Sequence, residues 1–300
     1  MYVIGLDFGG SAVKGAVMNT LGERLEKFSL PSRVNTLELW FESFDEYVQS
    51  FSQRYAIQGI AISACGAVDV ERGIVHGATL LPYIHGVELK QAFVDRYGLS
   101  VEIENDACCA ALAESEYGDF AHSELFCLVV IGSGVGGAIV SKGEIQKGHH
   151  LYGGEFGYSI LHFTEGQPQV LSELGSTRAL VNQTAKALDI AKSELNGLKV
   201  FQMYDEQHPV VVQVVEQWVE YLAQGLFNVQ YTVDPEYLIL GGAISQRADL
   251  ITMLEGKFAQ FSEKMPYCHL WPKVVASKFG NDANLIGAVV HFKRRQSSFS

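Results

Sequence analysis

The residues best suited to chemistry occur within the first twenty positions, in the stretch IGLDFGGSAVKGAVM from Ile4 to Met18. Between two apolar runs, this stretch holds an acid, paired glycines, a hydroxyl and a base: Asp7, Gly9, Gly10, Ser11 and Lys14. Glycine lets backbone N–H groups approach phosphate oxygens, because no Cβ intervenes. Ser11 adds a hydroxyl donor, and Asp7 is placed to hold Mg²⁺ through water, since this ion commonly binds one or two carboxylates together with phosphates. The stretch could therefore be a phosphate-binding turn or an ordinary tight turn with incidental polar residues.

A second glycine-rich loop, CLVVIGSGVGGAIVSKG, begins at Cys127. Gly132, Gly134 and Gly137 fit the G-x-G-x-x-G pattern of dinucleotide-binding folds, which requires a helix to open at the last glycine. The residues that follow, AIVSKGEI, contain three β-branched residues and are broken by Gly143, so they predict a strand and not a helix. This argues against a dinucleotide site. Either glycine loop alone would be interpreted as a tight turn. The two together favour phosphate binding, with Ser133 as a further hydroxyl donor.

A polar pair, Asn105 and Asp106, stands in EIENDACCAALAESE, where a predicted strand ends and an Ala-rich helix begins. In one interpretation Asp106 is the helix N-cap, whose side chain accepts backbone N–H bonds. In the other it is a general base, because a helix N-terminus favours an ionised carboxylate that can accept the proton of an attacking hydroxyl. Asn105, both donor and acceptor, suits a polyol substrate. Spacing alone leaves both interpretations open.

Alternating strands and helices must position these residues. Apolar residues at helical spacing predict helices over 37–56, 106–118, 214–234 and 282–295. β-branched runs predict strands on both sides of each of the two glycine turns, and further strands at GIAIS and VEIE. A third glycine pair, in YLILGGAIS, joins a strand to a further helix.

Each half of the chain begins with a hairpin around a glycine turn, so the sequence predicts two α/β domains with a ligand cleft between them. We expect a first domain over 1–117 and a second over 118–300, the last helix being able to pack back on the first domain. Within the second domain, only TEGQPQ at 164–169 and the terminal RRQSSFS are expected to be irregular.

Composition narrows the function classes. The net charge of −12 argues against nucleic acid or an anionic membrane as a partner, since either requires a basic surface. The five cysteines are odd in number and form no C-x-x-C motif, which is typical of reduced cysteines in a cytoplasmic protein. Neither a signal peptide nor an apolar run long enough to span a membrane is predicted.

Six ordered motifs between residue 3 and about residue 292 resemble those of the ROK family of bacterial sugar kinases and repressors. They read LDFGGSAVKGAV, ENDACCAALAE, VVIGSGVGGAIVSKGEIQKG, GGEFGY, VDPEYLILGGAIS and NDANLIGAVV. The resemblance implies the duplicated actin/hexokinase/Hsp70-like (ribonuclease H-like) fold, and phosphoryl transfer from Mg-ATP to a sugar hydroxyl in a homodimer.

The resemblance also implies roles for single residues. The phosphate loops would contain Asp7, Gly9, Gly10, Ser11 and Lys14 in the first loop, and Gly132, Ser133, Gly134, Gly136 and Gly137 in the second. Gly241 and Gly242 would lie near the adenosine, and Asp7 would hold the magnesium ion. The sugar would contact Gly66, Asn105, Asp106, Glu155 and Tyr158, with Asp106 as the catalytic base.

The departures from the family pattern fall around the sugar. Typical members have a histidine at the position of Tyr158, followed by a cysteine-rich zinc motif, whereas SILHFTEGQPQVLSELG contains no cysteine. We therefore predict no structural zinc, since such sites need four sulfur or imidazole ligands. The acid that ends the zinc motif is replaced by Ser172 or Glu173, and Leu80 stands where an asparagine is usual. A wider sugar pocket follows as a hypothesis.

The zinc-less pattern resembles a subgroup that includes β-glucoside kinases. The sequence therefore predicts an ATP-dependent kinase acting on the 6-hydroxyl of a hexose or of a β-glucoside such as cellobiose. One alternative is a monosaccharide kinase of the glucokinase, N-acetylhexosamine or N-acetylmannosamine type. Another is a non-catalytic sugar-sensing or regulatory protein. For a repressor we would expect a DNA-binding segment before the first phosphate loop, and this loop begins at Ile4.

Overall fold

The computed structural model describes residues 2–19, 21–77 and 81–297. The chain divides into two compact units, each built from more than one segment. The first unit contains Met1–His122, Lys147–Tyr152 and Asn281–Ser300, and the second contains Ser123–Gln146 and Gly153–Gly280. Leu80, singled out by the sequence, lies outside the described residues.

The first unit is built on a five-stranded sheet with the order β3-β2-β1-β4-β7. The strands are β1 (Tyr2–Phe8), β2 (Ala12–Asn19), β3 (Arg24–Pro31), β4 (Ile57–Ala64) and β7 (Ser100–Asn105). β1 pairs antiparallel with β2 and parallel with β4, and β4 pairs parallel with β7. A short hairpin of β5 (Ala67–Asp69) and β6 (Ile74–His76) follows β4.

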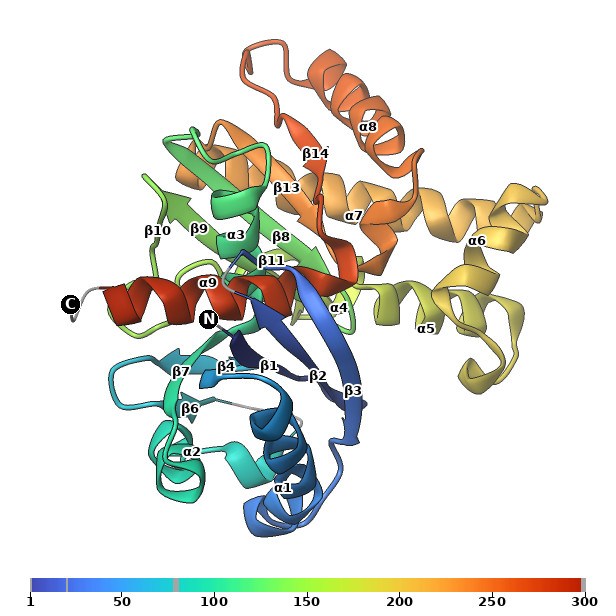
Figure 1. Cartoon of the computed structure of the whole chain (residues 1–300). Helices are drawn as coiled ribbons and strands as arrows, with labels where there is room; N and C mark the ends of the chain where they lie inside the picture. Colours follow the sequence, from blue (N-terminus) through green and yellow to red (C-terminus); the bar gives the residue numbers. More distant parts are fainter. Residues whose placement is uncertain (1, 20, 78–80, 298–300) are drawn as a thin grey trace. The chain divides into compact units, whose positions relative to one another are not determined.

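Helices cover both faces of this sheet, and the residues of β1 alternate between them. Ile4, Leu6 and Phe8 pack into the core beneath α1 (Leu37–Arg54) and α2 (Leu89–Tyr97). On the other face, α9 (Ala283–Ser297) packs against α3 (Asp106–Tyr117), β4 and β7 (Figure 1). Val3 of β1 joins the apolar cluster formed on that face, which includes Leu285 and Phe292 of α9. A short 3-10 helix, η1 (Pro82–Ile84), precedes α2.

The second unit repeats the strand pattern of the first, with the order β10-β9-β8-β13-β14. Its strands are β8 (Leu125–Ile131), β9 (Val135–Ser141), β10 (Glu144–Ile145), β13 (Tyr237–Gly241) and β14 (Val274–Ala276). As with β1 in the first unit, β8 pairs antiparallel with the strand after it and parallel with a strand reached through helices. The same topology in both units agrees with the duplicated organisation that the sequence predicts.

A long helix, α7, organises the core of the second unit; it packs against α4, α5, α6 and α8. The helices are α4 (Leu171–Gly175), α5 (Thr177–Leu188), α6 (Gly197–Asp205), α7 (Pro209–Val233) and α8 (Leu250–Lys264), with 3-10 turns η2 (Phe156–Tyr158), η3 (Lys192–Glu194) and η4 (Ala243–Gln246). A last 3-10 turn, η5 (Gly280–Asp282), begins at the final residue of the second unit and precedes α9. Over the parts of the chain that the structure describes, no helix is long and apolar enough to cross a membrane.

The helices predicted over 37–56, 106–118, 214–234 and 282–295 are confirmed as α1, α3, α7 and α9. The expectation that the terminal RRQSSFS is irregular is wrong for its described residues, because α9 runs to Ser297. The expectation of an irregular segment at 164–169 is also wrong. β11 (Ile160–Thr164) and β12 (Gln167–Val170) form an antiparallel hairpin there. Glu165 and Gly166 both have positive φ, at 50° and 77°, which is the geometry of a tight two-residue hairpin turn.

Candidate functional site

The first glycine loop joins β1 to β2 in the first unit, and its sequence leaves the backbone accessible. Gly9 and Gly10 are partly exposed and Ser11 is exposed, directly after the buried end of β1. A Cβ on Gly9 would lie 3.1 Å from the carbonyl oxygen of Ala12, so this position already favours glycine on packing grounds. Lys14 is exposed.

Asp7, at the base of this loop, is held by two neutral donors. Its exposed fraction is 7%, and its Oδ1 accepts hydrogen bonds from Ser63 Oγ (2.9 Å) and Asn284 Nδ2 (3.1 Å). Lys14 stands opposite Asp7 in the strand register, yet within the described residues no ion pair joins a lysine or arginine to this carboxylate. A buried carboxylate bound only by neutral donors is costly unless a cation compensates it.

The second glycine loop joins β8 to β9 in the second unit. The N–H of Gly132 donates to the carbonyl of Gly134 (2.9 Å), and the N–H of Val135 donates to Ser172 Oγ (2.9 Å). Thr177, at the start of α5, donates its N–H to the carbonyl of Gly132 (3.0 Å). Side chain and backbone of the α4–α5 region thus fix the shape of a loop on which Ser133 is exposed.

The glycines of the second loop fall into two groups. A Cβ on Gly137 would lie 2.5 Å from Phe156 and 2.6 Å from the carbonyl oxygen of Leu128, so packing requires glycine there. A Cβ on Gly132 or Gly136 would meet no atom within 4 Å. Packing within the chain therefore gives no reason for glycine at these two positions, whereas a ligand approaching the backbone would.

On the ATP-binding role that the family resemblance implies for this loop, replacing Gly132 by alanine is expected to leave the stability of the protein unchanged. It should raise the KM for ATP about tenfold, the cost of one hydrogen bond to a charged group. Steady-state kinetics with varied ATP would measure this. The matched control is Gly256→Ala on the exposed face of α8, where a Cβ also meets no atom. An unchanged KM for ATP in the Gly132 variant would remove this loop from the phosphate site.

The third glycine pair lies at the end of β13, next to the second loop. Gly241 is the register partner of Val130 in β8, so the second and third loops emerge from neighbouring parallel strands of one sheet. Gly242 has φ of 90° and lies against the backbone of Ile131, so a side chain would be both strained and crowded. The structure thus brings together the predicted phosphate and adenosine loops of the second unit.

At the start of α3, Asn105 and not Asp106 is the helix cap. Asn105 Oδ1 accepts the N–H of Cys108 (3.0 Å), and its Nδ2 donates to the carbonyl of Gly66 (2.9 Å) and to Asp106 Oδ1 (3.1 Å). Asp106 Oδ1 also accepts the N–H of Ala107 (2.9 Å). The interpretation of Asp106 as the N-cap is therefore wrong, and its carboxylate is oriented in the first turn of the helix. Gly66, Asn105 and Asp106 form one connected cluster.

A buried ion pair that the sequence analysis missed lies directly beneath this cluster. Glu104 is paired with Lys147, and its Oε1 also accepts the N–H of Asn105 (2.6 Å). Lys147 Nζ donates in addition to the carbonyl of Val68 (2.8 Å). Burial raises the pKa of Glu104 despite the neighbouring ammonium group. No local pattern could have revealed this pair, because 43 positions separate its two members.

Glu155 directly precedes the short helix η2 in the second unit, and Tyr158 is the last residue of that helix. Glu155 is partly buried, and burial raises the pKa of its carboxyl group. Tyr158 is 67% exposed, so it does not pack into the core. The structure places the hydroxyl of Ser172 on the second glycine loop, while Glu173 is exposed.

Three histidines lie in or near the segment where the family resemblance would place a zinc motif: His149, His150 and His162. His162 stacks on Tyr221 with ring centroids 5.6 Å apart, and His149 and His150 contact each other edge to face. Over residues 2–19, 21–77 and 81–297, no group of three histidine, cysteine or acidic side chains could hold a metal ion. The absence of structural zinc stays a prediction.

The chain matches the model of the ROK family over residues 3–295. It belongs to this family. A β-glucoside kinase of Klebsiella pneumoniae is 30% identical to this ROK protein over 98% of this chain and 97% of its own length. A β-glucoside kinase of Listeria innocua is 28% identical, with 99% of each chain covered. A ROK family protein from Streptococcus pneumoniae TIGR4, solved in complex with sucrose, has a TM-score of 0.87 and 32% identity, covering 99% of this chain and 100% of its own.

These similarities confirm the predicted fold class. The two five-stranded sheets of this ROK protein, with helices around each, belong to the actin/hexokinase-like fold of its structural relatives.

Proposed function

We propose that this ROK protein transfers the terminal phosphoryl group of ATP to the 6-hydroxyl of a β-glucoside such as cellobiose, with Asp106 as the general base. Family membership and the named sugar kinases among its relatives make it an ATP-dependent sugar kinase. The observation that carries the assignment of the base is the fixed orientation of Asp106. Its Oδ1 is held by Ala107 N–H and by Asn105, whose amide is itself tied to Gly66.

Asp106 has the electrostatic setting that a base requires. It lies in the first turn of a twelve-residue helix, where the helix dipole favours the ionised carboxylate. In the proposed step the carboxylate accepts the proton of the sugar hydroxyl as the hydroxyl oxygen attacks the phosphorus atom of ATP. Asn105 and Gly66, which hold the carboxylate in place, are the proposed neighbours of the sugar ring in the same unit.

The glycine loops are proposed to hold the nucleotide. We assign phosphate binding to the loops at 9–11 and 132–137, adenosine binding to Gly241 and Gly242, and Mg²⁺ binding through water to Asp7. The residues fit this ion, since one buried carboxylate with neutral donors matches the Mg²⁺ habit of combining few carboxylates with phosphates. When bound, the ion supplies charge neutralisation at the phosphates. Lys14 and Ser11 are proposed to add an ammonium and a hydroxyl group.

The choice of a β-glucoside rests on two supports. Two relatives that align over nearly their whole length are named β-glucoside kinases, and the Streptococcus pneumoniae relative was solved with the disaccharide sucrose. In this chain a tyrosine, Tyr158, replaces the usual histidine and stands exposed. We propose that Glu155 and Tyr158 contact the sugar.

A substrate panel tests this choice directly. Values of kcat/KM for cellobiose, gentiobiose, glucose, N-acetylglucosamine and N-acetylmannosamine would be compared at fixed Mg-ATP. The proposal predicts the highest value for a β-glucoside. A clear preference for a monosaccharide would instead assign the protein to the glucokinase or N-acetylhexosamine kinase type. Sugar binding with no phosphate transfer at all would indicate a sugar-sensing protein.

Replacing Glu155 by glutamine is expected to raise the KM for sugar about tenfold, because a charge-assisted hydrogen bond to a hydroxyl becomes a neutral one. Without sugar, the variant is expected to be more stable against unfolding than wild type near neutral and alkaline pH. The raised pKa of Glu155 means that wild type loses stability as the pH rises through this pKa. The variant should therefore be the more stable at about pH 8 and equal to wild type at about pH 4, where the carboxyl is protonated.

Thermal unfolding at the two pH values and sugar kinetics measure both effects. The control is Glu144→Gln at an exposed position of β10. If the Glu155 variant kept the wild-type KM for every sugar, Glu155 would have no role in sugar binding.

We further propose that the protein works as a homodimer in the cytoplasm, without a nucleic-acid partner. The net charge of −12 and the family resemblance support these assignments. Light scattering after gel filtration measures the oligomeric state, and a mass of about 33.0 kDa would contradict the dimer.

A further inference from the structure

A row of polar residues crosses four strands of the first unit. In the strand register, Lys14 of β2 stands opposite Asp7 of β1, Asp7 beside Ser63 of β4, and Ser63 beside Glu104 of β7. Two positions closer to the start of β1, β4 and β7, the same face carries Gly5, Ala61 and Glu102, and Ala16 of the antiparallel β2 stands opposite Gly5. One of these four residues is polar, against all four in the row at Asp7. The polar row thus begins at the ends of β1, β4 and β7, next to the first glycine loop and the start of α3.

Helix α9 places an amide over this row from the far end of the sequence. Asn284 Nδ2 donates to Asp7 Oδ1 at 3.1 Å across 277 positions, and Ser63 Oγ donates to the same oxygen at 2.9 Å. Within the described residues, Asp7 Oδ2 receives no hydrogen bond. One oxygen of the carboxylate is therefore fixed by two donors, which sets the direction of the other.

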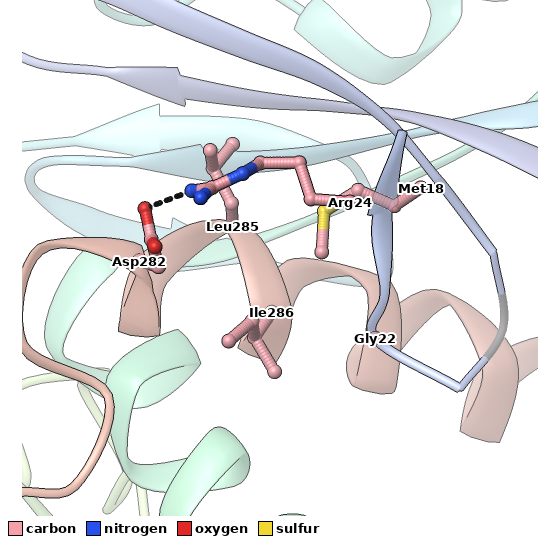
Figure 2. A pocket seen from close by; sticks show the side chains of 6 residues that line it. All are labelled: Met18, Gly22, Arg24, Asp282, Leu285 and Ile286. Carbon is pink, nitrogen blue, oxygen red and sulfur yellow. Dashed lines mark ion pairs between the residues drawn. The ribbon is translucent and has the colours of Figure 1, made fainter. Parts of the chain in front are cut away.

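The start of α9 is anchored on both sides of Asn284. Asp282 forms an ion pair with Arg24 of β3, and Leu285 packs into the apolar cluster with Met18 of β2 (Figure 2). Arg24 and Asp282 both line a cavity of about 260 Å³. Its walls are Met18, Gly22, Arg24, Asp282, Leu285 and Ile286. These contacts hold the amide of Asn284 in place before any ligand binds.

We infer that Asn284 and Ser63 are positioning residues that orient the Asp7 carboxylate for the metal–nucleotide complex. The inference rests on the proposed function, in which Asp7 holds Mg²⁺ through water. Partners of a metal-binding carboxylate keep it in the productive orientation, and their loss commonly lowers metal affinity 10–100-fold. Neither donor carries a charge, so neither of them competes electrostatically with a bound cation.

Binding of Mn²⁺ in the presence of ADP, followed by electron paramagnetic resonance without sugar, is the measurement. Asn284→Ala and Ser63→Ala should each weaken Mn²⁺ binding about tenfold, while ADP binding without metal stays unchanged. In an Asp7→Ala background, adding Asn284→Ala should have no further effect, because both changes act through one carboxylate. Asn281→Ala, three positions before Asn284 and exposed, is the control that should match wild type.

Wild-type Mn²⁺ affinity in both single variants would overturn the inference. It would also be overturned if Asn284→Ala weakened Mn²⁺ binding by the same factor in the Asp7→Ala background as in wild type. Ser63→Ala removes only one oxygen atom from a fully buried position, so it provides a second test if Asn284→Ala fails to fold. The proposed function is judged separately. Absence of sugar-dependent ATP turnover in wild type would refute that function whatever the variants do to Mn²⁺ binding.

Discussion

Asp106→Asn is expected to lower kcat by roughly 10²- to 10⁴-fold, the usual contribution of a positioned base. The asparagine side chain can still accept the N–H of Ala107 through its oxygen, so the start of α3 should keep its shape. ATP affinity should therefore remain near that of wild type, because the substitution removes proton acceptance and little else. Steady-state kinetics with varied sugar and varied ATP separate the two effects.

Asp95→Asn, at an exposed position of α2, removes a carboxylate of the same unit outside the proposed site and should behave as wild type. A near-normal kcat in the Asp106 variant would leave this residue a purely structural role at the start of α3. If ATP affinity fell by as large a factor as kcat, the substitution would have disturbed the structure of the site and not only removed a proton acceptor.

The second large effect is expected in stability. Lys147→Met should lower the free energy of unfolding by about 3–5 kcal/mol near neutral pH, the typical cost of leaving one member of a buried ion pair alone. The Glu104 side chain is 4% exposed, so solvent cannot take the place of the missing ammonium group. Urea unfolding measures the change.

The pH dependence of this loss has a definite sign. The pKa of Glu104 is already raised in the folded wild-type protein, and removing Lys147 should raise it further. A raised pKa in the folded state costs stability as the pH rises through it, so the deficit should be largest at alkaline pH and shrink toward about pH 4. The double variant Lys147→Met with Glu104→Gln should recover much of the loss. A deficit independent of pH would show that lost packing, and not the uncompensated carboxylate, is responsible.

Much of the fold could be predicted because local signals agree with the tertiary structure. The β-branched residues after Gly137 predict a strand, and β9 occupies that position. The hairpin of β11 and β12 was missed although its turn carries a signal. Gly166 is the signal, because glycine readily adopts the positive φ that a two-residue hairpin turn requires. The Thr, Gln and Pro residues around it are typical of loops, so composition alone predicts an irregular segment.

The site could be predicted only where its residues are neighbours in sequence. Asn105 and Asp106 are adjacent and both can cap a helix, so spacing could not decide which one does; the bond from Cys108 N–H to Asn105 decides it. Lys147 contacts Glu104, and Asn284 contacts Asp7, although each pair is far apart in the sequence. Their contacts follow from strand register and helix packing, which no local motif encodes.

The most direct test of the central claim is ADP release from Mg-ATP with and without cellobiose, combined with phosphorus NMR of the sugar product. Cellobiose is expected to stimulate ADP release, with the new phosphate attached to the 6-hydroxyl of its nonreducing glucose. ADP release that no β-glucoside or hexose stimulates would contradict the assignment of Asp106 as the base of a sugar kinase.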